Sequence, residues 1–256
     1  MGGELIVSTA TLLGFLLTLV RVAGVFVFVP MPGIGGVINP ARVIFALAVT
    51  IALFPLWPRI AVYPSIGMFV MWLMVEAALG IGIGLAVAFV TEAFGVGAQV
   101  LSLQAGYSFA TTFDPNTQAD SGVLVVFTQI ASGLLFFATG LDREVLRIFA
   151  RSMEIYPAGT FVLTRGAATQ VLLAGSTMFS TGLRLALPII AVMVMVDISI
   201  ALLGRVNSQL QLLSVAFPAK MLIGLTLLGW LALLFPVLYR AESGIALTMA
   251  RGLIAR

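Results

Sequence analysis

The chain has 256 residues, of which 61% are hydrophobic and 9% are charged, and its mean hydropathy is +1.17. A soluble globular domain carries about 25% charged residues, and so few polar side chains cannot cover the apolar surface of a chain this long. The composition excludes an ordinary water-soluble enzyme and predicts a surface that faces lipid or other proteins.

The net charge of +3 comes from 13 Lys and Arg against 10 Asp and Glu. The basic residues are mostly single arginines between apolar runs, so no continuous platform for a phosphate backbone is present and no nucleic-acid partner is expected. Cysteine and histidine are absent. Their absence excludes disulfide scaffolds and the usual zinc and iron sites and removes the commonest general base. We therefore expect a protein that is not an enzyme, with no metal and no cofactor.

Long apolar runs separated by turn-forming residues organise the chain. The runs cover, in chain order, about 5–29, 41–54, 65–90, 92–113, 123–138, 167–203 and 217–239. Residues 142–165 hold most of the charge. No sustained strand alternation is present, and most runs are apolar on all faces. The sequence predicts an all-α fold of six to eight hydrophobic helices, the form of backbone that a lipid environment permits.

Gly80 and Gly84 are four residues apart within the third run. A dinucleotide-binding loop would need a preceding strand and a further glycine, but Val87 stands at that position and the context is helical. The spacing instead predicts a Gly-xxx-Gly pair that lets two helices approach closely.

Three carboxylates lie inside apolar runs, namely Glu76, Glu92 and Asp197. Such groups are costly to bury and indicate either a role in proton-coupled transport or a structural ion pair. Asp197 and Arg205 are eight residues apart, about 80° round a helix, and they are predicted to form an ion pair.

Arg143, Arg147 and Arg151 are spaced four apart and predict one charged face of a helix. A solvated or interfacial face with local ion pairs is the simpler interpretation. A binding surface for a partner or for lipid headgroups is the alternative.

An apolar helix gives way to small, polar and aromatic residues between Gln104 and Asn116, where Asp114-Pro115 favours a turn. Irregular backbone at membrane depth persists where it is buried in protein or lines a cavity. The segment therefore predicts a cavity lining, with a surface connector between two helices as the alternative.

Motifs spread over nearly the whole chain resemble the FliR family, the flagellar export-gate subunit with relatives in type III secretion injectisomes. The motifs are Leu19–Gly24, Pro30, Pro40–Val43, Glu76–Gly84, Gln99–Pro115, Ala186–Pro188, Leu202–Leu210 and Phe217–Lys220. Ser208 departs from the proline that relatives usually have, and Leu141-Asp142 follows Gly140 where many have Gly-His.

The resemblance implies kinked helices and helical hairpins, with a FliP-like part at 1–165 fused to a FliQ-like hairpin and tail at 166–256. It implies a conical gate in the bacterial inner membrane, within the flagellar basal body, built with FliP-type and FliQ-type subunits. Further implied partners are FlhB- and FlhA-type proteins, lipid and unfolded export substrates. The same role in a virulence injectisome is an alternative, and so is a stand-alone membrane transporter, although no internal repeat supports the latter.

The resemblance also implies a pore plug. Its residues would be Gly106, Tyr107, Ser108, Phe109, Ala110, Thr111, Thr112, Phe113, Asp114 and Pro115. The small residues among them would allow close packing in the closed pore, while Phe109 and Phe113 would fill it.

Overall fold

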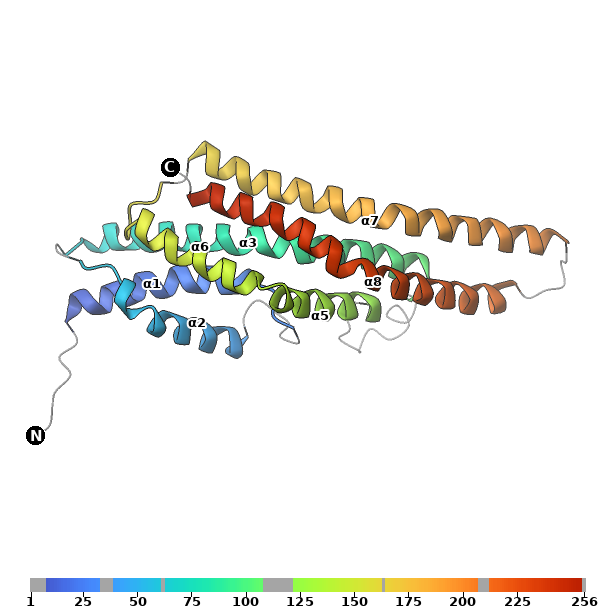
Figure 1. Cartoon of the computed structure of the whole chain (residues 1–256), viewed down its shortest axis with the longest axis horizontal. Helices are drawn as coiled ribbons and strands as arrows, with labels where there is room; N and C mark the ends of the chain where they lie inside the picture. Colours follow the sequence, from blue (N-terminus) through green and yellow to red (C-terminus); the bar gives the residue numbers. More distant parts are fainter. Residues whose placement is uncertain are drawn as a thin grey trace, which may run out of the picture. The chain divides into compact units, whose positions relative to one another are not determined.

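The computed structural model describes residues 8–32, 39–60, 63–107, 122–162, 164–206 and 212–254, without the side chains of 212–215. Helices, turns and irregular connections make up these residues, with no strand among them, which confirms the predicted all-α class. The elements are α1 (Thr9–Phe28), α2 (Pro40–Ala52), the short 3-10 helix η1 (Phe54–Leu56), α3 (Ile66–Gln104), α5 (Val123–Ala138), α6 (Leu141–Ile155), α7 (Arg165–Val206) and α8 (Leu212–Ile254) (Figure 1).

Local sequence signals set the ends of the first two helices. Ser8 caps α1 by accepting a hydrogen bond from the Thr11 amide at 3.2 Å, and α1 ends at Phe28, just before Pro30. Asn39 caps α2 in the same way, with Pro40 at its first position. Arg42 of α2 then donates to the last carbonyls of α1, including that of Val29 at 2.9 Å, so the two helices are joined where α1 ends.

The apolar run at 65–90 and the first part of the run at 92–113 form one helix of 39 residues, α3, where the sequence suggested two separate runs. Glu92 does not interrupt the helix because glutamate is a good helix former and its side chain is exposed. Gly106, with φ +85°, lies just beyond the end of α3 in the left-handed conformation that commonly stops a helix.

A bend of 66° separates α5 from α6. Gly140 lies at the bend with φ +74°, a conformation that glycine adopts without strain. Asp142 and Glu144 occupy the first turn of α6, where negatively charged side chains interact favourably with the helix dipole. Val145 and Phe149 are buried on the apolar face of the same helix.

Two compact units divide the chain. Unit 1 comprises 1–89, 136–175 and 243–256, and unit 2 comprises 90–135 and 176–242. The helices α3, α5, α7 and α8 contribute to both units. The predicted division after residue 165 coincides with the start of α7, so it cuts the chain differently from these units and stays a prediction about family segments.

Unit 2 is built around an antiparallel pairing of α7 and α8. Asp197 forms an ion pair with Lys220, and a side chain added at Gly224 would lie 3.4 Å from Met193. From the first contact to the second, the residue number falls by four on α7, from Asp197 to Met193, and rises by four on α8, from Lys220 to Gly224. This is the register of an antiparallel helix pair. The core cluster of this unit contains Leu101, Ala105, Leu124, Ile189, Met193 and Leu228.

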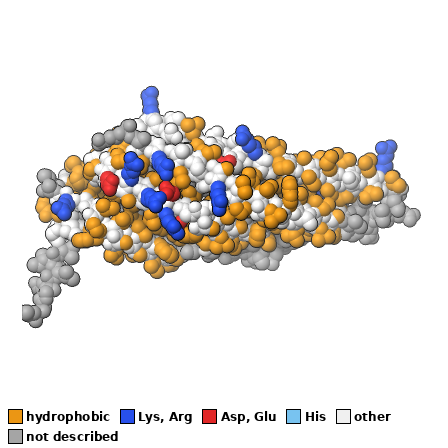
Figure 2. Space-filling view, viewed as in Figure 1, with side chains coloured by type: hydrophobic (Ala, Val, Ile, Leu, Met, Phe, Trp, Pro, Cys, Tyr) orange, Lys and Arg blue, Asp and Glu red, His pale blue; other side chains and the backbone are white. Residues whose placement is uncertain are grey.

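Four of the described helices are long and apolar enough to cross a membrane. They cover Thr9–Phe28, Ile66–Gln104, Arg165–Val206 and Ala216–Ile254, and the bent pair α5–α6 would make a fifth span. Figure 2 shows hydrophobic side chains over much of the visible face, with a group of charged side chains in the left half and isolated basic ones elsewhere. These features agree with the membrane character predicted from composition.

Candidate functional site

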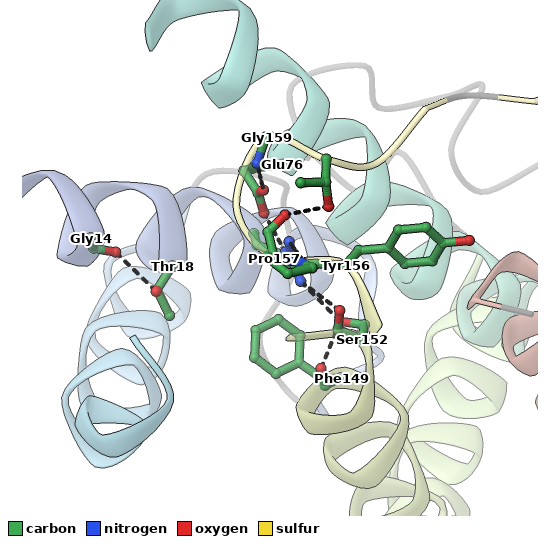
Figure 3. A network of polar contacts seen from close by, with 10 residues as sticks. Gly14, Thr18, Glu76, Phe149, Ser152, Tyr156, Pro157 and Gly159 are labelled. Atoms are coloured by element: carbon green, nitrogen blue, oxygen red, sulfur yellow. Dashed lines mark hydrogen bonds and ion pairs between the residues drawn. The ribbon is translucent and has the colours of Figure 1, made fainter. Parts of the chain in front are cut away.

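A buried polar network in unit 1 joins residues that are far apart in the sequence (Figure 3). Arg21 of α1 and Glu76 of α3 are each only 1% exposed, and the Nε of Arg21 forms an ion pair with Oε2 of Glu76. The guanidinium also donates to the carbonyl oxygens of Ser152 at 3.0 Å and Tyr156 at 2.9 Å. Both nitrogens beyond Nε are therefore engaged by the end of α6.

The second oxygen of Glu76 binds the segment after α6. Its Oε1 accepts a hydrogen bond from the Gly159 amide at 3.0 Å. Gly159 has φ +75°, and a Cβ there would lie 2.4 Å from the Trp72 ring, so only glycine fits. Both oxygens of Glu76 are satisfied within the protein, and this pattern favours a structural ion pair over a proton carrier.

Sequence reasoning singled out Glu76 as a buried carboxylate but did not identify Arg21 as its partner. The available signal was one arginine and one glutamate, each alone inside an apolar run. Charges in such runs are almost always paired when buried. Nothing in the sequence indicated which pairs would meet.

The backbones of α1 and α3 touch beside this network. A Cβ added at Gly80 would lie 2.2 Å from the carbonyl oxygen of Arg21, and one at Gly84 would lie 2.7 Å from that of Val25. From the other side, a Cβ at Gly24 would lie 2.9 Å from the Ile81 amide nitrogen. Gly80 and Gly84 thus occupy a helix crossing at which any side chain would collide with the opposing backbone.

This crossing also explains the position of the ion pair. Glu76 lies four residues before Gly80 and so shares its face of α3. Because Gly80 contacts the backbone of Arg21 itself, the arginine side chain is brought directly to the carboxylate. The Arg21–Glu76 ion pair therefore depends on the close approach of the two helices at Gly80.

A second feature, in unit 2, joins the described residues on either side of 108–121, a range that includes the predicted plug residues from Ser108 to Pro115. The Tyr107 amide donates to the carbonyl oxygen of Ser102 at 3.0 Å, and the Tyr107 hydroxyl donates to the carbonyl oxygen of Met221 at 3.0 Å. At the other end, a Cβ on Gly122 would lie 2.4 Å from the Oγ of Ser102. The last turn of α3 thus contacts the chain both where it leaves toward residues 108–121 and where it returns.

Of the predicted plug residues, Gly106 and Tyr107 lie within the described part of the chain and are placed as above. The others lie outside it: Ser108, Phe109, Ala110, Thr111, Thr112, Phe113, Asp114 and Pro115. The structure therefore describes the first two of the ten predicted plug residues.

Asp197 has a different partner from the predicted one. The structure pairs it with Lys220 of α8, and an Asp197–Arg205 pair is not among the ion pairs of the described residues. Arg205 lies two turns further along α7 itself, whereas Lys220 is brought opposite Asp197 by the antiparallel register. The remaining carboxylate that the sequence singled out in an apolar run, Glu92, is exposed.

The charged face of α6 carries local ion pairs. Arg147 binds Oε1 of Glu144 at 2.5 Å, and Arg251 from the end of α8 binds Oε2 at 3.0 Å. Both arginines are exposed and Glu144 is partly exposed, so each pair contributes at most about 1 kcal/mol to stability. Within the described residues, no group of three carboxylate, histidine or cysteine side chains is arranged as metal ligands.

Comparison with known proteins places this geometry in context. Residues 12–244 match the family described as bacterial export proteins, family 1. The chain is similar to flagellar biosynthetic protein FliR of Pectobacterium carotovorum, with 32% identity over 138 residues that cover 54% of this chain and 53% of the relative. It is also similar to FliR of Caulobacter vibrioides, with 28% identity over 203 residues that cover 78% of this chain and 81% of the relative. FliR of Escherichia coli is 28% identical over 137 residues, which cover 54% of this chain and 52% of the relative. The matched segments thus span about half the length of the Pectobacterium and Escherichia proteins.

Proposed function

The chain belongs to the bacterial export proteins, family 1, and we propose that it forms part of the flagellar protein export channel and of the plug that closes it. Its relatives are named FliR, so the family resemblance predicted from the sequence is confirmed. The proposed setting is the bacterial inner membrane within the flagellar basal body. The proposed partners are FliP-type and FliQ-type subunits, FlhB- and FlhA-type proteins, and unfolded export substrates.

The observation that carries the proposal is the shared anchor of residues 108–121. Tyr107 and Gly122 both contact Ser102 in the last turn of α3. A segment that begins and ends at one fixed point can be displaced without changing the helices that flank it. A plug needs this property, because it must leave the channel when substrate enters and return afterward.

The residues around Ser102 are tightly packed, so they would keep their positions if residues 108–121 were displaced. Leu101 and Ala105 of α3 lie in the buried core cluster, and Tyr107 packs against it while its hydroxyl bonds to α8. A side chain at Gly224 of α8 would lie 2.6 Å from the Cβ of Ala105. This tight packing supports a rigid rim around a displaceable segment.

The proposed work is mechanical. The buried ion pair of unit 1 is saturated with hydrogen bonds, which favours a scaffold over proton transfer. Energy for export would come from other parts of the apparatus.

Replacement of residues 108–121 by a Gly-Ser-Gly-Ser linker tests the plug. Because both anchors contact Ser102, a short linker can join Tyr107 to Gly122. We expect the variant chain to co-purify with the same hydrophobic partners as the wild type, while cells carrying it leak ions. Unchanged conductance in cells with an equal amount of assembled variant would refute the plug.

Purification in mild detergent separates this function from a stand-alone transporter. A gate subunit should co-purify with two other hydrophobic chains, whereas a transporter should run as a monomer or a homo-oligomer. Complementation of a flagellated strain that lacks its own FliR then separates a flagellar role from an injectisome role. Restored swimming supports the former, and failure to restore it in spite of assembly supports the latter.

A further inference from the structure

An apolar pocket of about 450 Å³ lies in unit 1 between α1, α2 and the bent pair α5–α6. Its buried floor is formed by Val22 and Val25 of α1, Phe136 of α5 and Phe149 of α6. Its volume falls within the range of about 300–1,000 Å³ that is typical of binding sites for small molecules. Neither Arg21 nor Glu76 is among the described residues that line this pocket.

The edge of the pocket is apolar and exposed. Phe45, Phe137 and Leu146 line it and are 50%, 48% and 44% exposed. Since α1 and the α5–α6 pair are apolar enough to cross a membrane, such an edge suits contact with hydrocarbon. A hydrocarbon chain could pass over these side chains onto the buried floor without crossing a polar barrier.

One charged side chain faces this apolar space. Asp142, in the first turn of α6, is the single polar residue among the described residues that line the pocket. Its Oδ1 is buried and has no hydrogen-bond partner among the residues that the structure describes. A buried carboxylate oxygen without a donor is unfavourable, so a ligand that supplies an N–H donor at this point would be bound preferentially.

We propose that this pocket binds a membrane phospholipid with an ammonium headgroup, of the phosphatidylethanolamine class. One acyl chain lies on the floor between α1 and α6, and the ammonium group donates to Oδ1 of Asp142. Charge complementarity selects the headgroup. A phosphatidylglycerol has no cation to offer and brings a net negative charge to the carboxylate. The lipid site lies within unit 1, and the proposal does not rest on the plug.

The test uses the full-length chain with its co-purifying partners, reconstituted in nanodiscs of equal phosphatidylethanolamine and phosphatidylglycerol. Native mass spectrometry then measures which lipid stays bound to the protein. We expect phosphatidylethanolamine to be retained about tenfold over phosphatidylglycerol, as befits one charge-assisted hydrogen bond. Equal retention of the two lipids by the wild type would overturn the proposal, and this result requires no variant to fold.

Three variants locate the site. Asp142→Asn preserves the shape of the side chain but removes its charge, so it should abolish the preference. Val49→Trp should fill the pocket and reduce retention of both lipids. Glu144→Gln is the matched control, because Glu144 lies on the same helix but binds arginines outside the pocket. An unchanged preference in Asp142→Asn, or unchanged retention in Val49→Trp, would refute the site.

Discussion

Replacing Gly80 with alanine should separate two helices that now touch through their backbones. The new Cβ would lie 2.2 Å from the carbonyl oxygen of Arg21, whereas ordinary contacts begin at 3.4 Å. Backbone atoms cannot rotate away as a flexible side chain can, so α1 and α3 must move apart by about 1 Å.

The free energy of unfolding should fall for two reasons. Overpacking of this kind costs about 1–3 kcal/mol. The shift also moves the backbone of Arg21, whose ion pair with Glu76 would cost about 3–5 kcal/mol if it broke completely. We therefore expect a loss of about 3 kcal/mol or more from Gly80→Ala.

Gly67 of the same helix is the matched control. A Cβ there would meet nothing within 4 Å, so the same substitution changes only the helix propensity. Because Gly67 is the second residue of α3 and not in its interior, Gly67→Ala should change the free energy of unfolding by no more than about 0.5 kcal/mol. Gly84→Ala, with its closest contact at 2.7 Å, should fall between the two.

Thermal unfolding in mild detergent, followed by tryptophan fluorescence, measures this order. Trp72 is a useful reporter because it packs against Gly159, which is bonded to Glu76. If Gly80→Ala were as stable as Gly67→Ala, the close crossing of α1 and α3 would be wrong. The explanation of the Arg21–Glu76 pair would then be wrong as well.

Three further outcomes are expected. Arg21→Met and Glu76→Leu should each lower the unfolding free energy by about 3–5 kcal/mol, while the double variant should lose much less than their sum; additive losses in thermal unfolding would exclude direct coupling. Gly106→Ala places a Cβ at φ +85° and should cost about 1–2 kcal/mol. Since this residue is the first of the predicted plug residues, the variant should also raise ion leak, and wild-type values for both measurements would show that its conformation is unimportant. Asp197→Asn should cost at most about 1 kcal/mol, because its pair with Lys220 is partly exposed; a loss above 3 kcal/mol in thermal unfolding would contradict that assignment.

The sequence alone determined the class of fold and many helix boundaries, because these depend on neighbours along the chain. High apolar content without strand alternation predicted helices that face lipid or protein. Pro30 marked the end of α1, and Gly140 lies where α5 gives way to α6. The family motifs predicted a plug at residues 106–115, of which the structure describes Gly106 and Tyr107.

Tertiary structure decided which charges meet. Asp197 was assigned to Arg205 because both lie on one helix, but an antiparallel neighbour brings Lys220 closer. Arg21 and Glu76 are 55 residues apart, and their pairing follows from the contact of Gly80 with another helix. Periodicity along a helix reports which residues share a face, whereas the partner of that face depends on how distant segments pack, and this packing has no local signal.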